Sequence, residues 1–181
     1  MSRHPKKIVI LGPESTGKST LCAQLAGHYH THYCPEYARE YLLSHGKKYD
    51  YDTLLAIAKG QLNLEEKTCL SASGNKKELI FIDTDMYVMK VWCEFVFNKC
   101  HPWILEQLAK RKYDLYLLCN TDLPWVKDEL REYPDLQTRG KLYKIYKDLM
   151  INQPVPWTEI SGEHNTRLKH SIAAVDSLLA G

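Results

Sequence analysis

The sequence lacks an apolar run long enough to cross a membrane. A membrane-spanning helix needs about 20 predominantly apolar residues, whereas the first apolar run, Ile8 to Leu11, stops at Gly12-Pro13. That run is also too short for the core of a secretory signal peptide. We therefore expect no membrane partner.

A large excess of either charge is also missing. The sequence has 24 basic and 22 acidic side chains, a formal net charge of +2. So small an excess creates no long-range field that would draw the chain onto nucleic acid or an anionic membrane. We expect a small-molecule partner and no nucleic acid. Nothing in the sequence indicates the oligomeric state.

The six cysteines include no C-x-x-C pair. A chain of 181 residues can bury a core without disulfide bonds. Reduced thiols and a cytoplasmic location are the simplest interpretation.

A glycine-rich motif stands near the start of the sequence, Gly12-Pro13-Glu14-Ser15-Thr16-Gly17-Lys18-Ser19. In the pattern Gly-x-x-x-x-Gly-Lys-Ser the glycines let the backbone wrap a phosphate, the lysine reaches the β and γ phosphates, and the serine hydroxyl reaches Mg²⁺. The apolar run Ile8 to Leu11 precedes the motif, and a helical pattern from Lys18 to about Tyr29 follows it. This order distinguishes a phosphate loop from an ordinary strand-to-helix turn and predicts ATP and Mg²⁺ as cofactors.

Further apolar runs alternate with helical patterns along the chain, at residues 79–82, 115–119 and 157–160. Buried strands that alternate with helices are typical of a parallel sheet covered on both faces. We therefore expect an α/β fold of the P-loop NTPase type, in three layers, as a single domain over residues 1–181. Ligands of such folds bind at the carboxyl ends of the strands.

Between the strands the sequence predicts helices at 36–43 and 52–69, followed by a loop at 71–75. Gly60 lies inside the second helix, where it is expected to be a tolerated weakness of about 1 kcal/mol. Residues 120–138 are polar and interrupted by proline. They are predicted to be exposed.

Acidic residues follow the strand predicted at 79–82. Asp83 stands where P-loop enzymes keep the carboxylate that holds Mg²⁺, although an acid capping the next helix would look the same. Asp85 precedes a helical run, so a substrate contact and an N-cap are both open for it.

Glu36-Tyr37-Ala38-Arg39 is expected at the same edge of the sheet. A carboxylate there would accept the proton of an attacking hydroxyl, and the arginine would anchor substrate or phosphate. An exposed ion pair between Glu36 and Arg39 is the alternative. Spacing alone does not decide between them.

The segment of about 121–140 contains Arg131 and Arg139. Arginines in a lid neutralise charge on a transferring phosphoryl group, whereas most arginines in polar segments are only solvated. Because a phosphate loop is present in the same chain, we interpret the segment as a helical lid over ATP.

Together these motifs resemble the ribosylnicotinamide kinase domain of the NadR family. The resemblance is carried by Gly-Pro-Glu-Ser-Thr-Gly-Lys-Ser-Thr-Leu, Glu-Tyr-Ala-Arg-Glu-Tyr, Phe-Ile-Asp-Thr-Asp and Pro-Trp-Val-Lys-Asp-Glu-Leu-Arg, and it extends from about Lys7 to the C-terminus. It implies transfer of the ATP γ-phosphoryl group to the 5′-hydroxyl of nicotinamide riboside. A kinase for another nucleoside, or an ATP-binding switch with slow ATPase activity, is the alternative function.

The residue patterns and the resemblance together predict roles for individual residues. ATP would be bound by Gly12, Glu14, Ser15, Thr16, Gly17, Lys18, Ser19, Thr20 and Arg139, and Mg²⁺ by Ser19 and Asp83. The substrate would be bound by Glu36, Tyr37, Arg39, Asp85, Trp125 and Asp128, and the catalytic residues would be Lys18, Glu36, Asp83 and Arg131.

The sequence departs from the family in two respects. Larger NadR proteins carry DNA-binding and adenylyltransferase domains ahead of the kinase, for which the residues before Gly12 leave no room, so we expect neither function. Some relatives have a tryptophan where this chain has Pro35. If that tryptophan stacks on nicotinamide, this chain needs another ring or another substrate.

Overall fold

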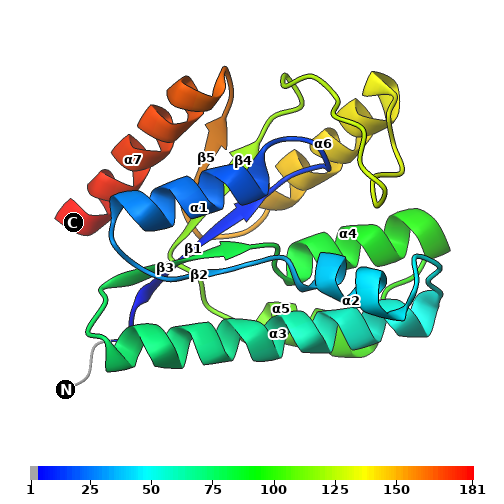
Figure 1. The fold of residues 1–181 in the computed structure, drawn as a ribbon, viewed down its shortest axis with the longest axis horizontal. Helices are drawn as coiled ribbons and strands as arrows, with labels where there is room; N and C mark the ends of the chain where they lie inside the picture. Colours follow the sequence, from blue (N-terminus) through cyan, green and yellow to red (C-terminus); the bar gives the residue numbers. More distant parts are fainter. Residues whose placement is uncertain (1–3) are drawn as a thin grey trace.

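A five-stranded, wholly parallel sheet forms the centre of the computed structural model, which describes residues 4–181. The strand order is β2-β3-β1-β4-β5, and helices cover both faces (Figure 1). The predicted α/β fold is therefore confirmed. The strands are β1 (Lys6–Leu11), β2 (Tyr33–Cys34), β3 (Leu79–Asp83), β4 (Leu115–Cys119) and β5 (Trp157–Ile160).

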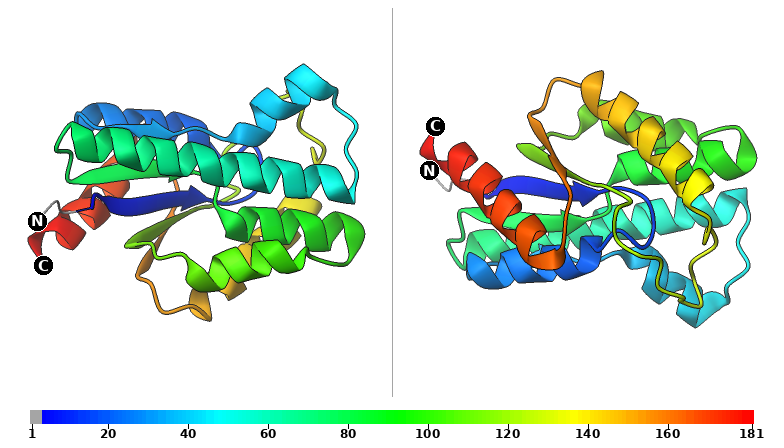
Figure 2. Two further views of the ribbon diagram at one scale, coloured as in Figure 1. Left: turned by 90° about the horizontal axis from the view of Figure 1, so that it is seen from below. Right: turned by 90° about the horizontal axis from the view of Figure 1, so that it is seen from above.

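Seven helices complete the described part of the chain. Both views of Figure 2 place α2 and the segment 120–135 at the end of the molecule opposite the C-terminus. The helices are α1 (Lys18–His28), α2 (Tyr37–His45), α3 (Tyr51–Gly74), α4 (Met86–Phe97), α5 (Pro102–Lys110), α6 (Leu136–Ile151) and α7 (His164–Ala180).

Strand β1 shows why the sheet is buried on both faces. Ile8 and Ile10 pack in the core beneath α1 and α7, whereas Val9 and Leu11 pack with residues of α3, α4 and α6. Successive side chains of a strand point to opposite faces, so a continuous apolar run is what a central parallel strand requires.

Helix α3 is longer than the sequence predicts and includes most of the expected loop at 71–75. The prediction was wrong because the serines and glycine of this stretch are polar or flexible, but Ala72 is fully buried against the sheet. Tertiary burial thus overrides weak local helix propensity.

Gly60 of α3 is also more than a tolerated weakness. A Cβ atom at this position would lie 1.9 Å from Cε1 of Tyr37. The close approach of α2 to α3 therefore requires glycine there.

The segment 120–135 contains no helix, so the prediction of a helical lid over 121–140 is corrected. Pro124 and Pro134 interrupt the segment, and α6 begins only after Asp135, whose side chain accepts a hydrogen bond of 2.6 Å from the N–H of Thr138. Arg139 consequently lies inside α6 and is 2% exposed. We call residues 120–135 the lid segment.

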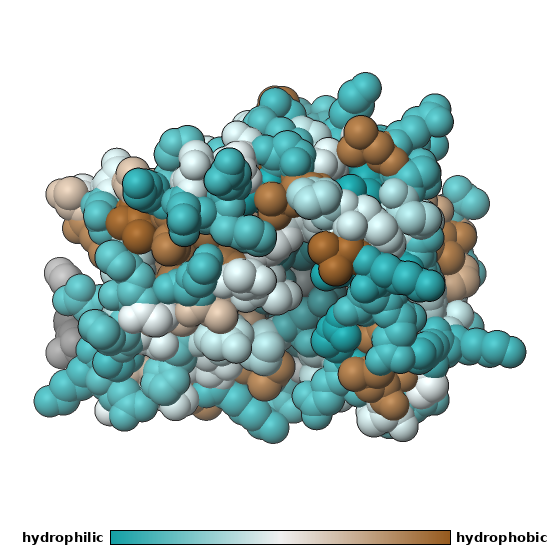
Figure 3. Space-filling view, turned by 45° about the horizontal axis from the view of Figure 1, so that its top comes forward, coloured by the Kyte–Doolittle hydropathy of each residue, from teal (hydrophilic) through white to brown (hydrophobic). Residues whose placement is uncertain are grey.

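The face shown in Figure 3 is mostly hydrophilic, with hydrophobic spots between polar side chains. Isolated exposed apolar residues of this kind are normal for a folded domain. Within residues 4–181, no helix is both long and apolar enough to span a membrane.

Candidate nucleotide-binding and phosphotransfer site

The phosphate loop connects β1 to α1 at the carboxyl edge of the sheet. Gly12 has φ of 140°, and a Cβ atom there would lie 2.6 Å from the carbonyl oxygen of Cys119. Gly17 adopts a left-handed conformation at the N-cap of α1, where no side chain caps the helix and the first turn contains no acidic residue. The N-terminal amides of α1 are therefore available to an anion.

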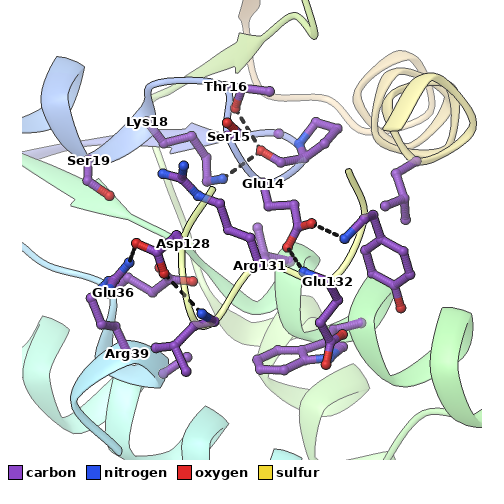
Figure 4. A pocket seen from close by; sticks show the side chains of 18 of the residues that line it. Glu14, Ser15, Thr16, Lys18, Ser19, Glu36, Arg39, Asp128, Arg131 and Glu132 are labelled. Atoms are coloured by element: carbon purple, nitrogen blue, oxygen red, sulfur yellow. Dashed lines mark hydrogen bonds and ion pairs between the residues drawn. The ribbon is translucent and has the colours of Figure 1, made fainter. Parts of the chain in front are cut away.

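Two side chains of the loop meet at the carbonyl oxygen of Pro13. The hydroxyl of Thr16 donates to it at 2.7 Å and Nζ of Lys18 at 2.8 Å. These bonds close the loop and hold the Lys18 ammonium at its mouth, where Figure 4 shows it in the cavity.

Ser19 and Asp83 lie side by side next to the loop. The Ser19 hydroxyl donates to Oδ2 of Asp83 at 2.5 Å, while the buried Oδ1 has no hydrogen-bond partner. Burial raises the pKa of Asp83, and the nearby Lys18 ammonium opposes this shift. The described residues contain no cluster of three protein ligands for a metal, but one carboxylate and one hydroxyl are the set with which Mg²⁺ is held between protein and nucleotide phosphates. The donor set therefore fits Mg²⁺.

Asp85 is the N-cap of α4. Its Oδ1 accepts hydrogen bonds from the amides of Tyr87 at 3.0 Å and Val88 at 3.4 Å, so of the two interpretations that the sequence left open, the structure shows the N-cap. Its side chain is fully buried and does not line the cavity described below. Thr84, between the two aspartates, has φ of 78°, a costly conformation for a β-branched residue.

Glu36 is the N-cap residue of α2, but its side chain makes no capping hydrogen bond. It lies in the cavity, on the side of Ser19 and Lys18 (Figure 4). Burial and the negative charge of Asp83 raise the pKa of Glu36, against the opposing charges of Lys18 and Arg39. A carboxylate with a raised pKa is better matched to accepting a proton near neutral pH.

Arg39 does not pair with Glu36. Its guanidinium instead forms an ion pair with Asp128 of the lid segment, a contact visible in Figure 4. Of the two sequence interpretations of this motif, the local ion pair is therefore wrong. Arg39 links α2 to the lid segment.

The lid segment is also bonded to the phosphate loop. The carboxylate of Glu14 accepts hydrogen bonds from the N–H groups of Glu132, at 3.1 Å, and Tyr133. The hydroxyl of Ser15 accepts one from the N–H of Val126 at 3.0 Å. Burial raises the pKa of Glu14, and the hydrogen bonds from the two amides oppose the shift. The lid segment thus lies closed over the loop.

Four aromatic rings also line the cavity. The Trp92 indole donates to the Tyr49 hydroxyl at 3.1 Å, and that hydroxyl donates to the Glu132 carboxylate at 2.9 Å. Phe95 and Tyr133 meet edge to face with ring centroids 5.4 Å apart. We call these four rings, from Tyr49, Trp92, Phe95 and Tyr133, the aromatic chamber.

The loop, Glu36, the lid segment and the aromatic chamber line one cavity of about 360 Å³, a size typical of small-molecule sites. The predicted site residues that line it are Gly12, Glu14, Ser15, Thr16, Gly17, Lys18, Ser19, Thr20, Glu36, Arg39, Asp128 and Arg131.

The other predicted site residues lie outside this lining. Asp83 is bonded to Ser19 just behind it. The Tyr37 ring packs where α2 meets Gly60 of α3. The centroid of the Trp125 ring lies 6.0 Å from Cζ of Arg131 and 5.7 Å from Cζ of Arg139. The placement of Asp85 and Arg139 outside the lining gives no support to the direct contacts predicted for them.

Sequence reasoning missed Tyr49, Phe95 and Tyr133, because a single aromatic residue does not reveal which cavity it lines. It also missed Arg167, the largest fully buried side chain. No local pattern identifies either kind of residue.

The glycine-rich loop between β1 and α1, the Ser19–Asp83 pair beside it and the cavity under the lid segment are the arrangement of a P-loop kinase fold. The chain belongs to the AAA domain family AAA_28, whose model matches residues 7–167.

The curated relatives include two NadR proteins. The chain is 26% identical to the trifunctional NAD biosynthesis/regulator protein NadR of Escherichia coli (strain K12), over 96% of this chain and 43% of that protein. It is 30% identical to the protein of the same name from Salmonella typhimurium, over 91% of this chain and 38% of that protein. The predicted resemblance to NadR is confirmed, and the chain spans about two fifths of these relatives.

Solved structures share the fold. A NadR protein in complex with NR superposes with a TM-score of 0.78 at 21% identity, over 97% of this chain and 51% of that one. Thymidylate kinase from Ehrlichia chaffeensis superposes with a TM-score of 0.69 at 14% identity, over 96% of this chain and 100% of that one. At these identities the likeness establishes the fold.

Proposed function

We propose that this chain is a nucleoside kinase that transfers the γ-phosphoryl group of ATP to the 5′-hydroxyl of nicotinamide riboside, giving nicotinamide mononucleotide and ADP. The observation that carries the proposal is one cavity whose lining includes the phosphate loop, Glu36 and the aromatic chamber. Supporting it are the NadR relatives, including one solved in complex with NR.

In this proposal the phosphate loop binds the triphosphate. Its backbone amides and Lys18 contact the β and γ phosphates. Ser19 and Asp83 would hold Mg²⁺, which would supply positive charge to neutralise those phosphates. Arg131 reaches from the lid segment toward Lys18 in Figure 4, where its guanidinium would stabilise charge on the transferring group.

Glu36 receives the proton of the acceptor. The 5′-oxygen attacks the γ-phosphorus as the bond from that phosphorus to the bridging oxygen of ADP breaks, and the hydroxyl proton passes to the Glu36 carboxylate. Because Glu36 lines the same cavity as the loop and the aromatic chamber, a nucleoside whose base lies in the chamber would have its 5′-hydroxyl within reach of both Glu36 and the γ-phosphate.

The aromatic chamber suits a flat, positively charged base. Aromatic faces attract cations, and the carboxylate of Glu132 is bonded to the Tyr49 hydroxyl at the chamber. Trp92 on α4 would supply the stacking ring that Pro35 cannot. This explains how a chain without the family's tryptophan would still bind nicotinamide.

The test is incubation with Mg-ATP and each of nicotinamide riboside, adenosine, cytidine, uridine and thymidine, with products identified by mass spectrometry. We expect nicotinamide riboside to be converted with one ADP formed per mononucleotide. Lys18→Ala is the control for a contaminating kinase.

The other outcomes identify the alternatives. Phosphorylation of a different nucleoside only would replace nicotinamide riboside as acceptor. ADP formation with no phosphorylated nucleoside would favour an ATP-binding switch and would overturn the kinase assignment.

A further inference from the structure

A phosphate loop works only if its backbone amides point toward the anion. When successive amides point inward, the carbonyl groups of the same peptides point away and need donors of their own. In this chain, Pro13 receives its donors from within the loop. The donors for Ser15 and Thr16 come from distant parts of the chain.

Arg167 of α7 supplies the donor for Thr16. Its Nη1 donates to the Thr16 carbonyl at 3.0 Å, its Nη2 to the Asn120 carbonyl at 3.0 Å, and its Nε to the Gly162 carbonyl at 2.7 Å. The same guanidinium forms an ion pair with Asp122. One side chain thus joins the segments that follow β1, β4 and β5.

Arg139 of α6 supplies the donor for Ser15. Its Nη2 donates to the Ser15 carbonyl at 3.1 Å and to the Leu123 carbonyl at 3.3 Å. Arg139 and Arg167 are each 2% exposed, and neither lines the cavity. Both guanidinium groups therefore lie behind the loop, away from the phosphates.

From these contacts we infer that Arg139 and Arg167 are positioning residues for ATP binding. By holding two successive carbonyl groups outward, they keep the loop in the conformation that aims its amides into the phosphate site before the nucleotide arrives. Pre-organisation of this kind improves affinity, because no binding energy is spent on ordering the loop when ATP binds. The inference concerns ATP and does not depend on which nucleoside is the acceptor.

The test compares Arg167→Met, Arg167→Lys, Arg139→Met and Arg139→Lys with the wild type. Calorimetric titration measures the Kd of Mg-ATP, a thermal melt measures stability, and a second titration measures the Kd of the acceptor. We expect each methionine variant to weaken Mg-ATP binding by about ten- to a hundredfold, the effect of losing hydrogen bonds from a charged donor. Acceptor affinity should be unchanged.

Arg111→Met is the matched control. Arg111 is a half-buried arginine that bonds Glu65 and Glu66, and it precedes β4, whereas the site lies at the carboxyl ends of the strands. Its loss should lower the melting temperature and leave the Kd of Mg-ATP unchanged.

The lysine variants separate charge from geometry. Lysine keeps the positive charge but not the planar fork of donors, so we expect only partial recovery of Mg-ATP affinity. Full recovery would show that charge alone acts and would overturn the positioning role. The inference would equally be overturned if the methionine variants had a lowered melting temperature, as expected for Arg111→Met, but bound Mg-ATP with the Kd of the wild type. If Arg167→Met does not fold, Arg167→Lys and Arg139→Met decide the question in the same way.

Discussion

Glu36 differs from the other carboxylates at the site in having no structural partner of its own. Glu14 is bonded to lid amides, Asp83 to Ser19, and Asp85 to the amides of α4. A carboxylate that lines the cavity and caps nothing is free to accept a proton. This contrast favours Glu36 over Asp85 as the general base.

We therefore predict that Glu36→Gln lowers turnover by about 10²- to 10⁴-fold, the contribution of a general base, with little change in the Kd of Mg-ATP. Steady-state kinetics and titration of Mg-ATP measure the two effects. Glu40→Gln, on an exposed position of the same helix, is the control and should be near normal. Near-normal turnover of Glu36→Gln, with a loss in Asp85→Asn, would transfer the role to Asp85.

At the scale of elements, the lid segment is held by unequal contacts. Glu14 accepts two backbone amides in a partly buried position, whereas Lys47 and Glu129 form an ion pair whose side chains are 53% and 52% exposed. Exposed ion pairs contribute little, but hydrogen bonds to a charged acceptor contribute more. Glu14 is thus the stronger link between the loop and the lid segment.

Glu14→Ala should accordingly open the lid segment in the nucleotide-free protein. Hydrogen exchange followed by mass spectrometry should show faster exchange over residues 126–133, because the amides of Glu132 and Tyr133 lose their acceptor. Glu129→Ala should exchange like the wild type. Unchanged exchange in Glu14→Ala would mean that the other contacts of the segment, among them Arg39 with Asp128 and Ser15 with Val126, are enough to hold it closed.

At the contact between α2 and α3, packing predicts a change in stability on Gly→Ala substitution that is opposite in sign to the change that helix propensity predicts. Alanine for glycine inside a helix ordinarily stabilises by up to about 1 kcal/mol. We expect this for Gly27→Ala in α1, where a Cβ atom meets nothing within 4 Å. Gly60→Ala should instead destabilise by about 1–3 kcal/mol, the cost of overpacking, because its Cβ would overlap the Tyr37 ring. Urea unfolding of both variants tests the pair, and stabilisation by Gly60→Ala would contradict the close packing.

At the scale of the whole molecule, the site is assembled from segments far apart in the chain. The phosphate loop follows β1, Asp83 ends β3, and the lid segment follows β4. Since β3 and β4 flank β1 in the sheet, their carboxyl ends meet at one edge. Binding at that edge should therefore stabilise the entire domain.

Mg-ATP at about 100 times its Kd should raise the stability by about 2.7 kcal/mol. For a domain of this size, each kcal/mol corresponds to about 2–4 °C in melting temperature, so calorimetry should show a shift of several degrees. Lys18→Ala should melt at the same temperature with and without Mg-ATP. If Mg-ATP raised the melting temperature of Lys18→Ala as much as that of the wild type, the nucleotide would bind at a site other than the phosphate loop.

Much of the fold could be predicted because its determinants are local. The buried strands are continuous apolar runs, and the phosphate loop is a contiguous motif with its strand and helix attached. The errors concern segments whose state depends on distant contacts: the last turn of α3, which Ala72 anchors to the sheet, and the lid segment, whose prolines and the Asp135 cap delay the start of α6.

The class of protein and the nucleotide half of the site could be predicted from the sequence, since one short motif contains the glycines, lysine and serine that a phosphate requires. The other contacts of the site arise only when the chain folds. In the folded chain Arg39 pairs with Asp128, Arg139 lies behind the phosphate loop, and Arg167 contacts Thr16, 151 residues away in the sequence. The physical reason is that a guanidinium or an aromatic ring has no preferred partner until the fold places a carbonyl group, a carboxylate or a cavity beside it.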